Sequence, residues 1–243
     1  MYLRSHGSEI VSQLFLRKDV HLCVTDNAAV FLDLSRDKYL GLNAESLPPL
    51  LELMSASVHD ERHVRLLADG LQAQALTTTD PSLGYPLAPL TIELADKPLP
   101  VLDSPEQFDI CADVKMRDVL TLLMSYLRAT FNLRCHSLRY AIHNAKERKQ
   151  RLHRESTTSN LDLVKRLVHV FQRIRPLIYT AHNKCILDSA TLVEFLAYHD
   201  IYPTWVLGVK TGPFRAHSWV QYGQYVLNDN PVETRRYTPI LAV

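Results

Sequence analysis

The sequence KCILDSATLVEFL at residues 184–196 places a lone cysteine, Cys185, at the front of an apolar pattern with helical spacing. Three further segments, YPTWVLGVK at 202–210, RAHSWVQ at 215–221 and QYVLND at 224–229, read as antiparallel strands, and a short turn joins the last two. Helices followed by strands predict an α+β fold. The residues that share the inner face of the predicted helix are Ile186, Ala190, Val193, Leu196 and Ala197.

Three residues of these segments have the side chains that attack on a peptide bond requires. The attacking species is a thiolate, and the helix N-terminus expected at Cys185 favours that form. An imidazole, here His217, takes the proton and later gives it to the leaving amine, while a carboxylate, here Asp229, fixes the imidazole tautomer. Each residue alone also fits a buried thiol, a core histidine or a turn aspartate. Order, spacing and element type together favour a catalytic triad.

KCILDSATLVEFL, RAHSWVQ and QYVLND resemble the transglutaminase-like cysteine peptidases that are the B proteins of lasso peptide gene clusters. The resemblance implies a transglutaminase/papain-like domain in which Cys185 is the nucleophile, His217 the base and Asp229 its orienting partner. It also implies a physical partner, an ATP-dependent, asparagine-synthetase-like lasso cyclase that receives the freed core peptide. One departure is SWVQ at 218–221, where many relatives carry AWVE, and we expect it to change the solvent face of the strand.

The N-terminal part predicts a small domain of three strands followed by helices. Residues 20–43 read as three short strands separated by the turn sequences TDNA and SRDK. A helix is expected to start near the N-cap Asn43, and a second amphipathic stretch follows it. This order resembles a winged helix-turn-helix. It also resembles the PqqD-like element that binds leader peptides of ribosomally made natural products, here fused to the peptidase.

Such a domain can bind a peptide by adding it as a strand to an open sheet edge. The expected edge is the third strand, and the second amphipathic helix offers an apolar groove wall. A DNA-binding role is disfavoured by charge, since residues 1–76 hold 7 Arg and Lys against 10 Asp and Glu, a net charge of −3. The expected leader contacts are Lys38, Tyr39 and Leu40 on the strand and Val64, Leu67 and Leu71 on the helix.

Proline content predicts how the chain is divided. Six of the 13 prolines fall between residues 77 and 105, which excludes a regular helix there and favours an extended linker lying against a domain surface. We therefore predict a leader-recognition domain at 1–76, a Pro-rich linker at 77–110 and a cysteine peptidase domain at 111–243.

Beyond the linker, residues 112–131 and 161–175 have helical period. In the first of these segments Val119, Leu120, Leu123 and Leu127 share one side. Residues 139–154 hold six basic groups. They fit either a solvated helix face or a docking surface for an acidic peptide, a partner enzyme or a nucleotide phosphate.

The overall composition narrows the function classes. With 27 basic and 26 acidic residues the net charge is +1, so no general attraction to nucleic acid or anionic lipid is expected. The sequence shows neither an export signal nor an apolar run long enough to span a membrane, so we expect a cytoplasmic protein with reduced thiols. The four cysteines, Cys23, Cys111, Cys135 and Cys185, form no CxxC pair, and we expect no cofactor and no metal.

Two other functions stay open. The same triad suits a transglutaminase-type acyl transferase that uses an amine instead of water. A different class is a non-catalytic leader-binding scaffold or zinc-binding adaptor, whose metal ligands would be His182, Cys185, His217 and Asp229.

Overall fold

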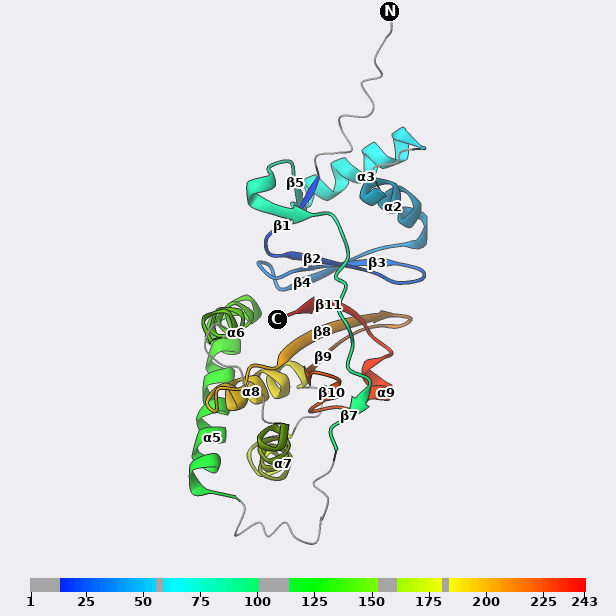
Figure 1. The fold of residues 1–243 in the computed structure, drawn as a ribbon. Coiled ribbons are helices and arrows are strands. Elements are labelled where there is room, and N and C mark those ends of the chain that lie inside the picture. The colour runs from blue at the N-terminus through cyan, green and yellow to red at the C-terminus, as the bar shows by residue number, and fades with distance from the viewer. Residues whose placement is uncertain (1–13, 56–58, 101–113, 153–160, 181–183) are drawn as a thin grey trace, which may run out of the picture. The chain divides into compact units, whose positions relative to one another are not determined.

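The chain forms two compact units in the computed structural model, which describes residues 14–55, 59–100, 114–152, 161–180 and 184–243 (Figure 1). The first unit consists of Met1–Thr91 with Val209–Arg215 and Thr238–Leu241. The second consists of Ile92–Gly208, Ala216–Tyr237 and Ala242–Val243. Among the described residues, none of the helices combines the length and the apolar character needed to cross a membrane.

The three strands predicted over residues 20–43 are confirmed. They form an antiparallel sheet in the order β2-β3-β4. Leu22 lies opposite Phe31 and Phe31 opposite Leu40, so these apolar side chains share one face of the sheet and pack in the core of the first unit. The strands are β2 (Val20–Val24), β3 (Ala29–Asp33) and β4 (Lys38–Leu42).

Two helices follow the sheet, as predicted, and pack on its apolar face. Asn43 is an N-cap: its Oδ1 accepts from the Ser46 N–H at 3.2 Å and so starts the 3₁₀ turn η1 (Ala44–Ser46). Asp60 caps the second helix by accepting from the His63 N–H. The helices are α2 (Leu47–Ser55) and α3 (Glu61–Ala73), and they contribute Leu50, Leu53, Val64, Ala68 and Leu71 to the core.

A second small sheet, which the sequence did not predict, involves the first part of the expected linker. Its order is β5-β1-β6, and both outer strands pair antiparallel with the central one. Residues 77–86 therefore belong to the first unit, and the division of the chain falls after Thr91. The elements are β1 (Phe15–Arg17), β5 (Thr77–Thr78), η2 (Pro81–Leu83) and β6 (Gly84–Pro86).

The C-terminal part contains a five-stranded sheet with the order β11-β8-β9-β10-β7. The three strands predicted around YPTWVLGVK, RAHSWVQYG and QYVLND are β8, β9 and β10, while β11 and β7 were not predicted. β7 comes from the expected linker and pairs in parallel with β10. The bounds are β7 (Lys97–Pro98), β8 (Thr204–Thr211), β9 (Phe214–Tyr222), β10 (Tyr225–Val226) and β11 (Thr238–Ala242), with α9 (Pro231–Thr234) before β11.

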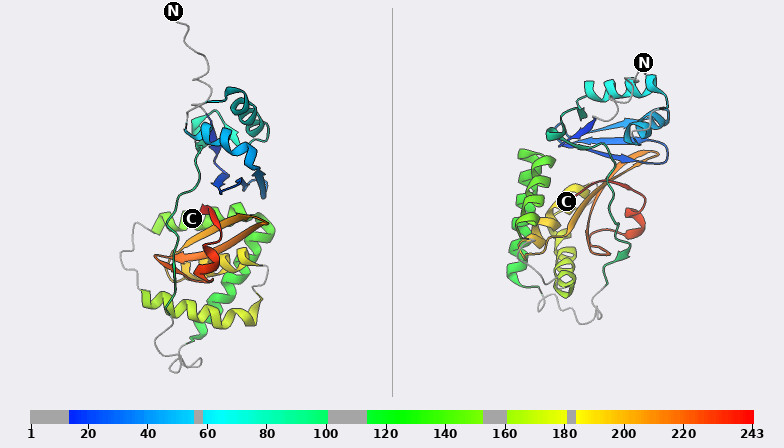
Figure 2. Two further views of the ribbon diagram at one scale, coloured as in Figure 1. Left: turned by 90° about the vertical axis from the view of Figure 1, so that its right-hand side faces the viewer. Right: turned by 45° about the horizontal axis from the view of Figure 1, so that its top comes forward.

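Helices lie beside this sheet, and α8 lies between it and the helices α5 and α7 (Figures 1 and 2). Trp219 and Val206 are fully buried in the sheet's core with Ala95 and Val226. The helical elements are α5 (Met116–Phe131), the π-helical turn η3 (Asn132–His136), α6 (Leu138–Leu152), α7 (Leu161–Ile178) and α8 (Cys185–Ala197).

Two of these helices differ from the sequence expectation in the side that they bury. α8 is not half-exposed: every residue from 188 to 196 is buried, including Asp188 and Glu194. In α5 the buried side is formed by Asp118, Leu122, Ser125 and Ala129. Leu120, Leu123 and Leu127, expected together on one side, share the side that faces solvent.

Candidate active site

Cys185 is the first residue of α8, where the backbone geometry favours an anion. The preceding residue, Lys184, is the N-cap but makes no side-chain capping bond. The first backbone N–H groups of a helix have no partner within the helix, so they and the helix dipole stabilise negative charge at the thiol. The Cys185 side chain is half-buried, so a substrate can still reach it.

The structure brings the three residues of the predicted triad together. His217 on β9 is hydrogen-bonded through Nε2 to Oδ2 of Asp229, which follows β10. Cys185 lies close enough to the imidazole to contribute to raising its pKa, and the remaining ring nitrogen, Nδ1, is available to face the thiol. The side chains of His217 and Asp229 are 22% and 23% exposed, so both groups are largely buried but still accessible to solvent.

The electrostatics of this series favour a charged imidazole. Burial lowers the pKa of His217, but the hydrogen bonds to Asp229 and Cys185 and the attraction of both acidic groups outweigh it and raise the pKa to about 9. Burial acts to raise the pKa of Asp229, but the hydrogen bonds from His217 and from the Asn230 N–H hold it below its ordinary value. A pKa of about 9 corresponds to a protonated imidazole at neutral pH, which can donate its proton to a leaving group.

Aromatic rings fix the position of the His217 imidazole. It stacks on Trp219 with ring centroids 6.1 Å apart and lies 5.0 Å from the ring of Tyr237. Gly208 on β8 makes room for this arrangement, because a Cβ at that position would come within 2.8 Å of the Trp219 ring and 3.0 Å of Tyr237 Cβ. The site therefore depends on a glycine in the neighbouring strand.

Asn228 links the elements that carry the three residues. Its Oδ1 accepts from the Val220 N–H on β9 at 2.8 Å. Its Nδ2 donates to Asp188 Oδ2 at 3.0 Å and to Ser189 Oγ at 3.2 Å, both on α8. Since Asn228 directly precedes Asp229, one side chain fixes the strand, the helix and the carboxylate relative to one another. The sequence reasoning missed this role.

Helix α7 completes the polar network around Asp188. Arg175 Nη1 and Tyr179 OH each donate to Asp188 Oδ1 at 3.1 Å. Burial, together with the neighbouring carboxylate, raises the pKa of Tyr179, so its hydroxyl stays protonated and donates. Gln172 Nε2 donates to the Leu227 carbonyl at 3.3 Å. Asp188, buried one turn after Cys185, is therefore satisfied from α7 and from the Asp229 loop.

The second buried carboxylate of α8, Glu194, is held by arginines from two other helices. Arg148 of α6 forms a bidentate pair with it, at 2.7 and 2.5 Å. Arg128 of α5 approaches the same group at 3.4 Å. Arg148 belongs to the basic run predicted at 139–154, so at least this member of the run serves the packing of α8.

The SWVQ segment does not form a solvent face, which corrects the expectation for residues 218–221. Ser218 is 1% exposed and its Oγ accepts from Trp205 Nε1 at 2.7 Å. Gln221 is 6% exposed, and its amide accepts from the Ala95 N–H at 3.2 Å and donates to the Glu93 carbonyl at 2.9 Å. An ionised glutamate could not donate the second bond, so glutamine suits this buried position.

The predicted leader contacts divide into two groups. Lys38, Tyr39 and Leu40 lie on β4, which pairs with β3 alone among the described strands and so forms a sheet edge. Val64 and Leu71 are each 2% exposed and fill the core of the first unit, so they do not line an open groove. Leu67 is partly buried and is the one predicted helix contact with an accessible surface.

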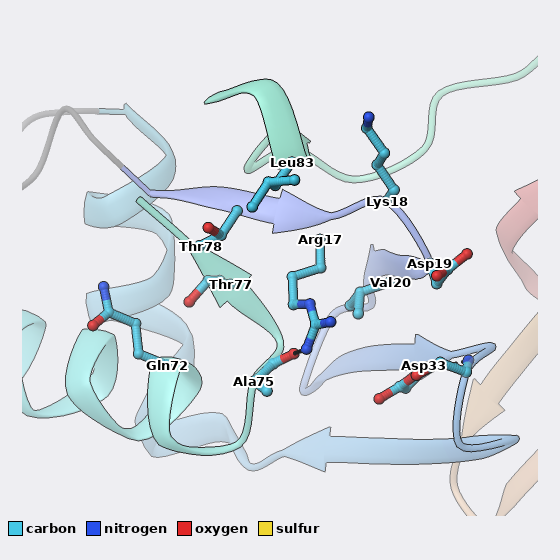
Figure 3. A pocket seen from close by; sticks show the side chains of 11 residues that line it. Arg17, Lys18, Asp19, Val20, Asp33, Gln72, Ala75, Thr77, Thr78 and Leu83 are labelled. Carbon is cyan, nitrogen blue, oxygen red and sulfur yellow. Dashed lines mark hydrogen bonds between the residues drawn. The ribbon is translucent and has the colours of Figure 1, made fainter. Parts of the chain in front are cut away.

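The first unit also contains a cavity of about 450 Å³ at a different place (Figure 3). It lies among β1, β5 and the end of α3, and it contains none of the predicted leader contacts. Charges of both signs line it, but Arg17 donates to the Ala75 carbonyl at 3.3 Å, and Asp33 accepts from the Ser35 and Arg36 backbone N–H groups. Arg17 and Asp33 therefore already have hydrogen-bond partners within the first unit, and we assign no ligand to this cavity.

The remaining cysteines differ from Cys185 in their surroundings. Cys23 is fully buried, and burial raises its pKa to about 12, so it is an inert core thiol. Cys135 is exposed on η3, and Cys111 lies outside the described residues.

The alternative zinc site rests on four residues, of which His182 lies outside the described part of the chain. Within the part that the structure describes, no group of three or more His, Cys, Asp or Glu side chains has an arrangement that could hold a metal ion.

Comparison with known families identifies the domain that carries the site. Residues 124–242 match the family model of the transglutaminase-like superfamily, so the chain contains a transglutaminase-like domain that includes Cys185, His217 and Asp229. A domain of this class fits a cysteine peptidase or an acyltransferase. No match was found among curated proteins or among solved structures.

Proposed function

We propose that this protein is the leader peptidase of a lasso peptide pathway: its transglutaminase-like domain cleaves the precursor while its N-terminal domain holds the leader. The observation that carries the catalytic part is the grouping of Cys185, His217 and Asp229: His217 is hydrogen-bonded to Asp229 and lies near the thiol at the start of α8, where Lys184 makes no side-chain capping bond. The lasso assignment is supported by the resemblance of the three segments that carry these residues.

Hydrolysis follows from the roles of the triad. The Cys185 thiolate attacks the carbonyl carbon, and a C–S bond forms as the carbonyl oxygen takes the negative charge. The backbone N–H of Cys185 supports this oxyanion. The C–N bond then breaks as the His217 imidazolium donates its proton to the leaving amine. Water, deprotonated by the neutral His217 imidazole, attacks the thioester, and the C–S bond breaks to release the leader and regenerate the Cys185 thiolate beside the imidazolium.

The N-terminal domain, winged helix-like in the order of its elements, would raise the local concentration of the scissile bond by binding the leader. The edge of β4, with Lys38, Tyr39 and Leu40, supports strand addition because β4 has a single partner among the described strands. The freed core peptide, with its new amine, would pass in the cytoplasm to an ATP-dependent, asparagine-synthetase-like cyclase.

An acyl transferase is the second candidate, because a transglutaminase-like domain fits this activity as well. Both reactions share the acyl-enzyme and differ in the acceptor, which is water or an amine. Incubation of the protein with the precursor peptide encoded beside it, followed by mass spectrometry, separates them. Two fragments support the peptidase, whereas a cross-linked product supports the transferase and overturns hydrolysis.

The same assay tests the nucleophile. Cys185→Ala should abolish cleavage, by about 10³-fold or more, and should keep leader binding measured by fluorescence anisotropy. Cys135→Ser is the matched control, because that thiol is exposed and lies outside the triad. Cleavage by the Cys185→Ala variant near the wild-type rate would refute the assignment.

Leader binding has its own test, which is independent of cleavage. Leu67→Gln should weaken leader binding about tenfold, because it removes the remaining apolar helix contact. Leu66→Gln is the matched control, since the neighbouring leucine is 61% exposed. Equal affinity of both variants would exclude Leu67 from the leader-binding site.

A further inference from the structure

Helix α5 presents a continuous apolar stripe to solvent. The helix lies at the outer edge of the second unit, with α8 on its inner side (Figure 1; Figure 2, right). The stripe repeats every three or four residues, so its members lie on one side of the helix. They are Met116, Leu120, Leu123, Met124, Leu127 and Phe131, which are 72%, 56%, 40%, 54%, 51% and 56% exposed. We name this set the α5 stripe.

The core uses the opposite side of α5, so within the described residues the stripe contributes little to packing this helix on its neighbours. The buried side carries Asp118, Leu122, Ser125 and Ala129, and two of these four are polar. Asp118 pairs with Arg166 of α7 at 2.7 Å. Six large apolar side chains exposed together on one helix are more than the scattered single residues of an ordinary surface.

Aromatic residues extend the α5 stripe beyond the end of the helix. Phe131 packs edge-on against His136 of η3, with ring centroids 5.3 Å apart. His136 in turn lies 4.3 Å from Tyr140 of α6, which is 41% exposed. The apolar surface therefore has an aromatic end, the kind of residue that is enriched where proteins bind each other.

Between residues 114 and 146, the exposed charges beside the α5 stripe have one sign. Between residues 114 and 146 the sequence contains a single acidic residue, Asp118, and it is buried and paired. Lys115, Arg117 and Arg134 are exposed along or beyond the helix. In a two-fold dimer the same surface would face itself, so these cations would meet like charges. An occupant with acidic flanks fits this border better than a second copy does.

We propose that the α5 stripe docks an acidic amphipathic helix of a partner protein. Met116, Leu120, Leu123 and Leu127 have the alternating four- and three-residue spacing of the seam between paired helices. A 16-residue helix offers a seam about 24 Å long. The partner helix would place its leucines on this seam and its glutamates opposite Lys115, Arg117 and Arg134.

The test uses the full chain and two synthetic helices of equal length. Both are stapled, monomeric and fluorescent, with leucine at the a and d positions, and they differ in carrying glutamate or lysine at e and g. Fluorescence anisotropy should show binding of the acidic helix at least tenfold tighter than binding of the basic one. The Leu123→Gln, Leu127→Gln double variant should lose at least tenfold, with unchanged circular dichroism and unchanged alkylation of Cys185.

A control variant and two further measurements make the result decisive. Leu177→Gln, which removes an 85% exposed leucine from α7, should bind the acidic helix like the wild type. Equal binding of both helices, or binding of neither, overturns the proposal. Sedimentation with vesicles of anionic lipid that is lost in the double variant assigns the stripe to a membrane instead. Dimers of the wild type that the double variant lacks, measured by light scattering, assign it to a second copy.

Discussion

Helices α8 and α5 pack against each other but differ in which kind of side chain they bury. α8 buries two carboxylates, Asp188 and Glu194, whereas α5 leaves six large apolar residues 40–72% exposed. The difference lies in the partners that surround each helix. The carboxylates of α8 receive hydrogen bonds from three other elements, which offsets the cost of burying them. What a helix buries therefore depends on its neighbours as much as on its own pattern.

The contrast also separates two roles. α8 carries the proposed nucleophile, and its residues 188–196 are all buried by neighbouring elements, so the thiol at the start of the helix has a fixed position. α5 is held from one side only, which leaves its other side for a partner. The following predictions test this division, beginning with the largest expected effect.

The first prediction concerns the buried carboxylate of α8. Glu194→Ala should lower the free energy of unfolding by about 2–4 kcal/mol, because it leaves two arginines at the α8 packing without their partner. Denaturation followed by tryptophan fluorescence reports on this region, since both tryptophans, Trp205 and Trp219, belong to the second unit. Glu147→Ala, which removes an exposed glutamate of α6, should cost less than about 1 kcal/mol. Equal losses would show that the burial of Glu194 does not matter.

The second prediction concerns the link from α8 to the triad. Asn228→Ala should lower kcat/KM by about 10–100-fold, because Asp229 and Cys185 lose their common support. The rate of Cys185 alkylation in a Cys135→Ser background should fall as well, which a loss of substrate contacts alone would not produce. Gln224→Ala, in the exposed turn of the same β-ribbon, should match the wild type. A lower unfolding temperature with full activity would restrict Asn228 to a structural role.

The third prediction concerns pH. His217 must be protonated to donate to the leaving amine, and its pKa is raised to about 9, so kcat/KM for a peptide should fall as pH rises through about 9. The contribution of this raised pKa to the free energy of unfolding is complete below the pKa of about 6.5 that His217 has in the unfolded chain. It is lost as pH rises through about 9. Asp229→Asn removes one of the groups that raise it and should move the alkaline limb to lower pH. If the alkaline limb of the pH profile does not move, it is caused by the titration of a group other than His217.

The smallest effect is expected on α5. Leu123→Gln with Leu127→Gln should lower the free energy of unfolding by no more than about 1 kcal/mol, because the two residues are already 40% and 51% exposed. Leu122→Ala, at a fully buried position one residue away, should cost about 2–5 kcal/mol. A large loss in the double variant would mean that the α5 stripe is covered by other parts of the chain.

The sequence allowed the proximity of Cys185, His217 and Asp229 and the main strands to be predicted because these depend on local signals. Residue order, a helix start at Cys185 and alternation along β9 and β10 place the three side chains near one another. The side of α5 that faces the core could not be predicted, since its buried side is no more apolar than its exposed one. The strands β5, β6 and β7 are two or three residues long and lie among prolines, so no periodicity marks them.

The sequence nevertheless contained a signal for the hydrogen-bond network that surrounds Asp188. Asp188 interrupts an apolar run one turn after Cys185, and a carboxylate at such a place requires donors. The sequence does not show which donors these are, because Arg175 and Asn228 come from different elements. Gln221 was misplaced for a similar reason: its partners, Glu93 and Ala95, lie more than a hundred positions away in the chain.

The pairing of β7 with β10 has a consequence for the covalent chain. The segment that leaves the first unit is hydrogen-bonded into the sheet through Gln221 and β10, a few residues before Asp229. A nick in the backbone between residues 100 and 114 would leave those bonds in place. The two polypeptides would then share these hydrogen bonds without a peptide bond between them.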